Sequence, residues 1–210
     1  MSELIEPKSR IQDAAHKLLM KYGIRTVSMD DIAASLGMSK KTLYHYYQDK
    51  DELVKAVVDA MLDENRCSCS NCIGVAENAI HEVFLTMDMM VDVFGEMNPS
   101  VIFELQKYHP KSYQSFLKHK SEFILCAIKA NLERGLKEEL YRADINMDVL
   151  SRYRLESMFI PFNPDFQISL NKKFTLLEIE EQIILNFLFG LVTAKGYKLA
   201  MKYLDKKKLG

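Results

Sequence analysis

In the first part of the chain, apolar residues recur at steps of three and four, the spacing that places side chains on one face of an α-helix. The first stripe consists of Ile11, Ala14, Ala15, Leu18, Leu19 and Tyr22. Ser9 and Gln12 have the spacing of a capping box at its start, and Gly23 supplies the left-handed residue expected after its end. The pattern therefore predicts a helix that starts at Ser9 and stops at Gly23.

Two short helices are predicted next. Ser28 is a typical N-cap for a helix that ends at Gly37, and Ser39 is a typical N-cap for the following helix. In that following helix the apolar positions Leu43 and Tyr47 share one face and are expected to point inward. The two residues between Leu36 and the second N-cap leave room only for a tight turn.

The rest of the chain keeps helical periodicity. Asp49 and Glu52 form a capping box for a fourth helix, expected to end at Arg66. The further expected helices are 74–94, 99–107, 110–135, 146–159, 175–192 and 195–205, with a loop over 161–164. Asn-Gly and Asp-Gly hairpin signals and sustained period-2 alternation do not occur in the sequence. We therefore predict an all-α fold.

The segment Leu176–Val192 is apolar over an unusually large part of its circumference. Such a helix needs packing partners on two sides. One side can join the core of its own subunit, and the other can meet a second copy of the chain together with helix 146–159. This arrangement predicts a homodimer with a two-fold, four-helix interface, whereas a fully buried helix within a monomer is the alternative.

The pair Ser28–Leu36 and Ser39–Tyr47 has the organisation of a helix-turn-helix motif, in which the second helix enters the DNA major groove. Gly37 forms the turn, and the small side chain of Ala33 lets the two helices approach closely. The outer positions of the second helix offer donors, a methyl group and rings suited to base edges and phosphates. These positions are Lys40, Lys41, Thr42, Tyr44 and His45.

The run from Gly23 to Leu53, which includes Leu43-Tyr-His-Tyr-Tyr47 and the following Lys50, resembles the DNA-binding domain of the TetR family of bacterial transcriptional repressors. Carried over by position, the resemblance implies DNA contacts at Thr26, Ser28, Thr42, Tyr44, His45 and Lys50. Ser39, Lys40 and Lys41 complete the set of candidate DNA-binding residues. Lys40 and Lys41 occupy positions where the family varies, so the resemblance implies no base preference.

The resemblance also implies a domain organisation. A helix-turn-helix DNA-binding domain is expected over 1–50, and a larger helical ligand-binding and dimerisation domain over 51–210. The expected partners are double-stranded operator DNA, a second copy of the chain and an unidentified small-molecule ligand. Within the second domain, the segment 83–97 is rich in methionine and aromatic residues, which suit an adaptable apolar pocket among the helices from 74 to 160. A plain hydrophobic core is the alternative for these residues.

Charge is distributed unevenly along the chain. Its 210 residues contain 28 Lys and Arg against 29 Asp and Glu, which excludes a polybasic protein that coats nucleic acid. Residues 1–50 carry a net charge of +2 and residues 51–210 carry −3, so DNA contact is expected to be local. The longest nearly apolar run, 183–192, is far too short to span a membrane, and no signal peptide is evident. A cytoplasmic protein without membrane contact is expected.

Three cysteines, Cys67, Cys69 and Cys72, lie at the expected end of the fourth helix. With a fourth ligand from Cys126, from His81 or from the partner subunit they could hold zinc or a metal cluster, or they could oxidise to a disulfide. The same DNA-binding fold would then act as a thiol or metal sensor. Incidental reduced thiols in a loop are the favoured interpretation, so no metal and no cofactor is expected.

The sequence favours a repressor that a small molecule releases from its operator. An enzyme is not expected, because a nucleophilic triad, a glycine-rich phosphate loop and a His-Glu-x-x-His motif do not stand out in the sequence. An alternative from another class is a helical small-molecule-binding protein without regulatory DNA binding.

Overall fold

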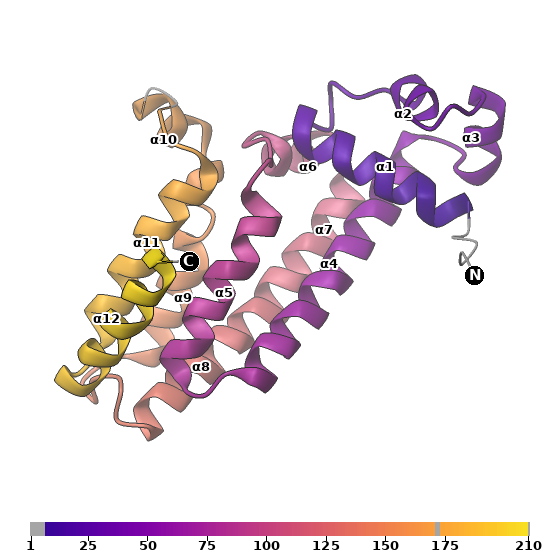
Figure 1. The fold of residues 1–210 in the computed structure, drawn as a ribbon. Coiled ribbons are helices and arrows are strands. Elements are labelled where there is room, and N and C mark those ends of the chain that lie inside the picture. Colours follow the sequence, from indigo (N-terminus) through magenta and orange to yellow (C-terminus); the bar gives the residue numbers. More distant parts are fainter. Residues whose placement is uncertain (1–6, 171–172, 210) are drawn as a thin grey trace. The chain divides into compact units, whose positions relative to one another are not determined.

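A computed structural model describes residues 7–170 and 173–209, and within these ranges the chain is helical and contains no strand (Figure 1). The all-α prediction is confirmed. The α-helices are α1 (Pro7–Tyr22), α2 (Met29–Ser35), α3 (Lys40–Tyr46), α4 (Lys50–Val75), α5 (Ala79–Phe94), α6 (Val101–Tyr108), α7 (Pro110–Lys118), α8 (Leu125–Lys137), α9 (Met147–Ser157), α10 (Pro164–Ser169), α11 (Leu176–Leu191) and α12 (Ala194–Leu209). A π-helical segment, η1 (His119–Ile124), joins α7 to α8, and a 3₁₀ turn, η2 (Ile160–Phe162), precedes α10.

The described residues form two compact units. The first contains residues 7–64 and 96–117, and the second contains 65–95, 118–170 and 173–209. Helices α1 to α3, the first part of α4, α6 and most of α7 thus belong to the first unit. Helix α4 passes from the first unit into the second without a break in its secondary structure. No helix in the described ranges is long and apolar enough to cross a membrane.

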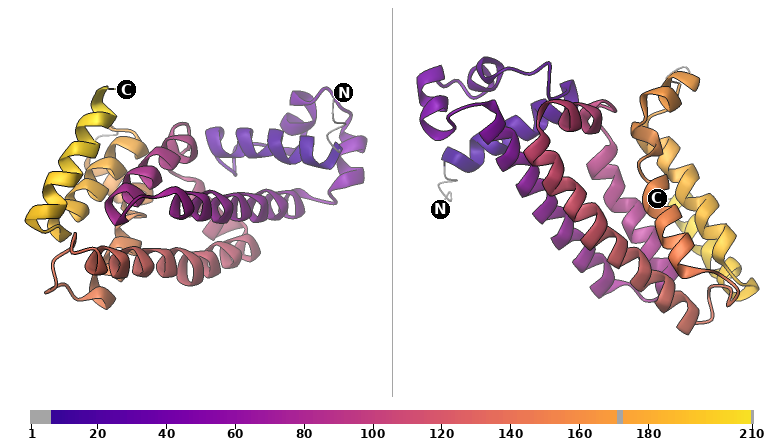
Figure 2. Two further views of the ribbon diagram at one scale, coloured as in Figure 1. Left: turned by 60° about the horizontal axis from the view of Figure 1, so that its bottom comes forward. Right: turned by 180° about the vertical axis from the view of Figure 1, so that it is seen from behind.

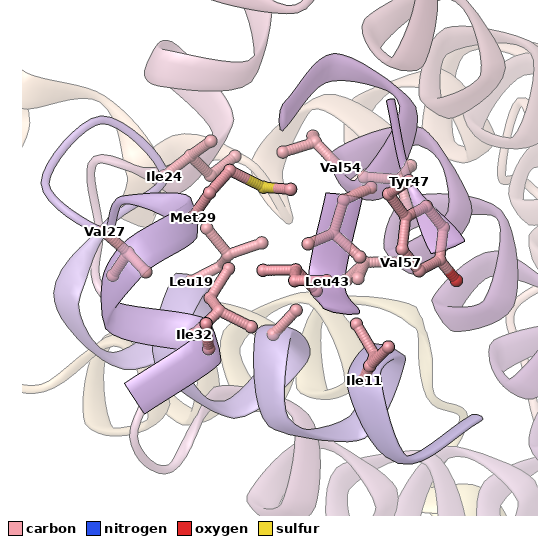
Figure 3. Close-up of a cluster of buried hydrophobic side chains, with 14 of the residues drawn as sticks. Ile11, Leu19, Ile24, Val27, Met29, Ile32, Leu43, Tyr47, Val54 and Val57 are labelled. Atoms are coloured by element: carbon pink, nitrogen blue, oxygen red, sulfur yellow. The ribbon is translucent and has the colours of Figure 1, made fainter. Parts of the chain in front are cut away.

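The first unit has a core of apolar side chains, and Figure 3 shows those from α1, α2, α3 and α4. Val101 and Leu105 of α6 belong to the same core. The fully or almost fully buried members include Ile11, Ala15, Leu19, Ile24, Ile32, Ala33, Leu43, Tyr47, Leu53, Val54, Val57 and Leu105. The inward positions predicted for the short helices, Leu43 and Tyr47, are confirmed, with exposed fractions of 0% and 1%. Helices α1, α2 and α3 alone would bury little apolar surface, so α4 and α6 complete the core that holds them.

Helix α1 starts earlier than its capping signal indicated. Its first residue is Pro7, so Ser9 lies inside the first turn and the predicted Ser9–Gln12 capping box is wrong. Proline suits this position because its missing N–H would have no helical acceptor there. The predicted end is confirmed: Gly23 has a φ of 91°, and its N–H donates to the carbonyl of Leu19.

Helix α4 starts as predicted but ends at Val75 rather than at Arg66. At its start, the carboxylate of Asp49 accepts from the N–H of Glu52 at 2.8 Å, whereas the Glu52 carboxylate accepts from Gln48 instead of closing the box on Asp49. The segment after residue 66 contains cysteine, serine and asparagine but no proline, and residues of this kind cost an established helix little. The cysteine cluster therefore lies on a helix and not in the expected loop.

In the second unit, α5 packs against α8, α11 and α12, and α9 packs against both α8 and α11. Figure 2 shows α11 and α12 running side by side. The loop expected over 161–164 is instead η2 followed by α10, a correction with a local cause. Asn163 caps α10 by accepting from the N–H groups of Asp165 and Phe166, and Pro164 occupies the first helical position.

A buried ion pair joins α9 to α11 inside the second unit. Arg154 Nη2 donates to Glu180 Oε1 at 2.6 Å, and the two residues are 4% and 1% exposed. Among the described residues, Arg154 Nη1 and Glu180 Oε2 have no hydrogen-bond partner. Burial raises the pKa of Glu180, while the charge of Arg154 and its hydrogen bond oppose that rise. The pair therefore ties the two helices together at a site where an unpaired charge would be costly.

Candidate nucleic-acid interface

The nine candidate DNA-binding residues all lie in the first unit: two lie in the segment before α2, six lie on α3 or at its N-cap, and one is the first residue of α4. Eight have exposed side chains, and Lys50 is half-buried. Those on α3 and at its cap are Ser39, Lys40, Lys41, Thr42, Tyr44 and His45, and those elsewhere are Thr26, Ser28 and Lys50. The structure thus exposes the outer face of α3 while the opposite face of that helix is buried in the core.

Both serines predicted as N-caps perform that role. Ser28 Oγ accepts from the N–H of Asp31, and the Asp31 carboxylate accepts from the N–H of Ser28 at 2.8 Å, which makes a complete capping box. Ser39 Oγ accepts from the N–H of Thr42 at 3.1 Å. These bonds occupy one first-turn N–H of each helix and leave the serine and threonine side chains at the surface, where a phosphate could approach them.

The turn between α2 and α3 depends on Gly37. Its φ is 63°, in the left-handed region that residues with a Cβ rarely adopt. Behind the turn, the N–H of Met38 donates to the carbonyl of Ala33 at 3.0 Å, so the chain reverses directly over the end of α2. Together with the buried Leu43, this turn sets which face of α3 points outward.

The outer face of α3 carries aromatic, imidazole and ammonium groups. Tyr44 is 48% exposed, and its neighbours Lys41 and His45 are exposed as well. Tyr46 is half-buried, and its ring makes an edge contact with the ring of His45 at 5.4 Å between centroids. This face can donate hydrogen bonds to phosphates and base edges, which is the chemistry predicted for it.

Lys40 and Lys41 differ in their surroundings. Lys40 forms an ion pair with Asp30 of α2, and this bond raises the pKa of Lys40. Within the described parts of the chain, the side chain of Lys41 makes no hydrogen bond or ion pair. A phosphate or a base edge can therefore bind Lys41 without breaking an existing contact, whereas either must compete with Asp30 for Lys40.

Lys50 is held by the loop that precedes α2. Its ammonium donates to the carbonyl of Ile24 at 2.5 Å. Burial lowers the pKa of Lys50, and the charges of Glu104 and Asp31 oppose that shift. Any phosphate contact of Lys50 thus has to coexist with an internal bond that connects the start of α4 to the loop after α1.

Helix α6 contributes to this region, although no pattern in the sequence indicates that it does. Glu104 of α6 accepts a hydrogen bond from the backbone N–H of Arg25, in the same loop that Lys50 holds. The two residues are 79 positions apart in the chain. No local spacing pattern indicates a contact between residues so far apart, and only covariation among homologues could have pointed to it.

The three clustered cysteines are not arranged as a metal site. No group of three or more His, Cys, Asp or Glu residues in the described ranges is placed to hold a metal ion. His81, considered above as a fourth ligand, accepts from the N–H of Glu77 and stacks on Tyr203. Cys69 contacts Asn65 Oδ1 at 4.0 Å, and burial raises the pKa of its thiol to about 11 and also raises that of Cys72.

The cysteines differ in exposure, and burial raises the pKa of the Cys69 thiol, so the order in which the four thiols react can be predicted. At pH 8 we expect iodoacetamide to modify Cys67 and Cys126, which are exposed, well before Cys69, whose thiolate is populated at about one part in a thousand. Peptide mass spectrometry after timed quenching measures the order. In denaturant all four thiols should react at similar rates. Modification of folded Cys69 as fast as Cys67 would contradict the effect of burial.

An open depression of about 390 Å³ lies on the second unit. Its lining comes from the end of α9, from η2 and from α10: Glu156, Phe159, Ile160, Asn163, Asp165 and Phe166. The volume is within the range of small-molecule sites, but the depression is open to solvent. Met87 and Met90 of α5 belong to the segment 83–97, whose sequence suits an apolar pocket, but they do not line this depression. Both are buried in the core of this unit.

Comparisons with known proteins agree with this geometry. The sequence model of the family described as "Bacterial regulatory proteins, tetR family" matches residues 11–57. The uncharacterized HTH-type transcriptional regulator YvaF of Bacillus subtilis is 27% identical over 193 residues, which cover 88% of this chain and 95% of YvaF. A second HTH-type regulator, SAUSA300_2515 of Staphylococcus aureus, is 40% identical over 58 residues, 28% of this chain and 31% of that protein.

The fold is also known from solved structures. The transcriptional regulator FadR of Bacillus subtilis, solved in complex with stearoyl-CoA, superposes with a TM-score of 0.61 and 13% sequence identity. The match covers 85% of this chain and 96% of FadR. The likeness therefore extends beyond the helix-turn-helix motif to the helical second unit.

Proposed function

Because this chain is a member of the TetR family of transcriptional regulators, we propose that it represses transcription by binding operator DNA as a homodimer and that a small-molecule ligand releases it. In this proposal residues 1–50 form the DNA-binding domain, and 51–210 bind the ligand and dimerise. Its action on chromosomal DNA would take place in the bacterial cytoplasm.

The observation that carries the DNA-binding proposal is the exposed outer face of α3. Two capped helices and the turn at Gly37 hold this face in a fixed orientation relative to the core. Lys41 and Tyr44 project from it, and within the described ranges neither side chain makes a hydrogen bond or an ion pair. An exposed helix with rings and cations on one face is what insertion into a major groove requires.

A two-fold interface on α9 and α11 is the second part of the proposal. Val149 and Tyr153 of α9 are 61% and 51% exposed. The ring of Tyr153 lies 6.1 Å from that of Phe187 on α11, which is half-buried. Gly190 of α11 is exposed, and a Cβ at this position would meet no atom within 4 Å. These residues support an apolar surface that a second copy of the chain covers.

The ligand is proposed to bind in the second unit. FadR, of the same fold, was solved with stearoyl-CoA, so this architecture can hold a large amphipathic molecule. A ligand that prefers one arrangement of the dimer would shift its population away from the arrangement that fits two successive major grooves. The unbroken helix α4, which contributes residues to both units, is suited to transmit this change.

Two substitutions on α3 test the DNA-binding proposal. Tyr44→Ala is expected to weaken binding to operator and random duplex alike, about tenfold, because it removes a contact that does not depend on sequence. Lys41→Ala is expected to change the base preference at one or two operator positions. Gel shifts on duplexes selected from a random pool measure both effects.

The matched control is Lys198→Ala, which removes the same charge from an exposed position of α12 in the second unit. It should leave DNA binding unchanged. If neither α3 substitution alters affinity or preference, the face of α3 is not the DNA-binding surface. If the unaltered protein binds no duplex at all, the proposed function is wrong.

A further inference from the structure

Helix α6 and the residues before it hold the corner between α1 and α2. The N–H of Asn98 donates to the carbonyl of Met20, near the end of α1, at 2.7 Å. Beyond that contact, the carboxylate of Glu104 accepts from the backbone N–H of Arg25 at 2.8 Å. All four residues belong to the first unit. The corner that leads into the helix-turn-helix motif is therefore bonded to a segment far away in the sequence.

Glu104 is closely fitted to this corner. Its second oxygen, Oε1, accepts from the hydroxyl of Ser100 at 2.9 Å, so both carboxylate oxygens have partners and the side chain is fixed. Gly23, with its φ of 91°, lies directly beneath, and a Cβ at that position would be 3.1 Å from the Glu104 carboxylate. The carboxylate thus occupies the space that a larger residue at the end of α1 would need.

The same loop is held from its other side. Lys50 of α4 donates to the carbonyl of Ile24, whose side chain is 1% exposed in the core of the first unit, where Leu105 is also buried. Arg25 has a further contact with α6, because its guanidinium lies 5.7 Å from the ring centroid of Tyr108. The single peptide group that joins Ile24 to Arg25 is therefore bound at both ends, at its carbonyl by Lys50 of α4 and at its N–H by Glu104 of α6.

We propose that Glu104 is a positioning residue for DNA binding. This proposal rests on the proposed function. By binding the N–H of Arg25, it fixes the loop over 23–27 and with it Thr26 and the N-cap Ser28, the two candidate phosphate contacts at the start of α2. Glu104 itself need not touch DNA. It acts by limiting the conformations of the loop before DNA arrives, so that binding does not have to order the loop.

Three variants test this role: Glu104→Ala, Glu104→Gln and Glu96→Ala. Glutamine retains an oxygen that can accept from Arg25, so it should restore most of what alanine removes. Glu96 provides the matched control, since it lies in the same segment and pairs with Lys21 at 2.9 Å, but its side chain is 78% exposed. The readouts are operator affinity as a function of salt and amide hydrogen exchange of residues 23–28 in the free protein.

Glu104→Ala is expected to weaken operator binding about tenfold and to make the salt dependence less steep, because fewer phosphates are contacted. It should also accelerate exchange of the loop amides, whereas Glu104→Gln and Glu96→Ala should remain close to the unaltered protein in all readouts. Unchanged affinity and salt slope for Glu104→Ala would overturn the proposal, as would equal losses for alanine and glutamine. Failure of the unaltered protein to bind DNA would instead overturn the proposed function, and the proposal with it.

Discussion

Replacing Arg154 by methionine is expected to lower the free energy of unfolding by about 3 to 5 kcal/mol, because it leaves Glu180 buried without its partner. Glu180 is 1% exposed and its bonded oxygen depends on the guanidinium 2.6 Å away. Urea denaturation followed by circular dichroism measures the change. Arg152→Met is the matched control, since Arg152 is exposed on the same helix, and it should alter stability by no more than about 0.5 kcal/mol.

The loss of stability in Arg154→Met should depend on pH in one direction. Burial already raises the pKa of Glu180, and loss of the Arg154 charge should raise it further. A carboxyl group whose pKa is higher in the folded state than in the unfolded state stabilises the folded state most at low pH. That stabilisation is lost as pH rises through the folded pKa. The deficit of Arg154→Met should therefore be smaller at pH 5 than at pH 7.5.

A second substitution separates the loss of the pair from the loss of packing. In the Arg154→Met background, Glu180→Gln removes the buried charge and should recover part of the lost stability. The double replacement Arg154→Met with Glu180→Leu should lower the free energy of unfolding less than Arg154→Met alone. A double variant that is no more stable than the single one would show that the pair matters through packing rather than through charge.

Placing a carboxylate in the proposed subunit interface is expected to have the largest effect on function. Tyr153→Glu should convert the proposed dimer to a monomer at micromolar concentration, since it would place an unpaired charge from each subunit in the proposed interface. Operator affinity should then fall by about 100-fold or more, because the second DNA-binding domain no longer binds intramolecularly. Light scattering and gel shifts measure the two effects.

The control for this prediction is Lys137→Glu, a charge reversal at an exposed position of α8. It should leave the protein dimeric. Thermal unfolding of Tyr153→Glu shows whether the subunit itself remains folded, as expected for a residue that is 51% exposed. A dimer that survives this change would exclude the α9 and α11 surface as the interface. If the unsubstituted protein is already a monomer in light scattering, the proposed homodimer is excluded.

The helix-turn-helix could be predicted from the sequence because its determinants are local. A serine cap acts within three residues, and the turn needs only a left-handed residue at Gly37. The caps Ser28 and Ser39 and the inward side chains Leu43 and Tyr47 were therefore placed correctly. The same local information placed most of the later helices within a few residues of their observed bounds.

Sequence signals gave wrong helix bounds where the same residues were compatible with more than one start or end. Ser9 has the spacing of a cap, but Pro7 starts α1 at an equally suitable position. The cysteine cluster resembles a loop in composition, yet α4 continues through it because Cys67 to Cys72 include no proline or glycine. In both cases the propensities differ by less than the stabilisation that tertiary packing supplies.

The sequence alone determined the all-α fold, the helix-turn-helix and the residues that α3 presents, because each depends on contacts within about four positions along a helix. Only the tertiary structure decided that Glu104 binds the loop after α1, that Lys50 does so from the other side, and that Arg154 pairs with Glu180. These contacts join residues 26 or more positions apart, and they form only when packing of the apolar faces brings the helices together.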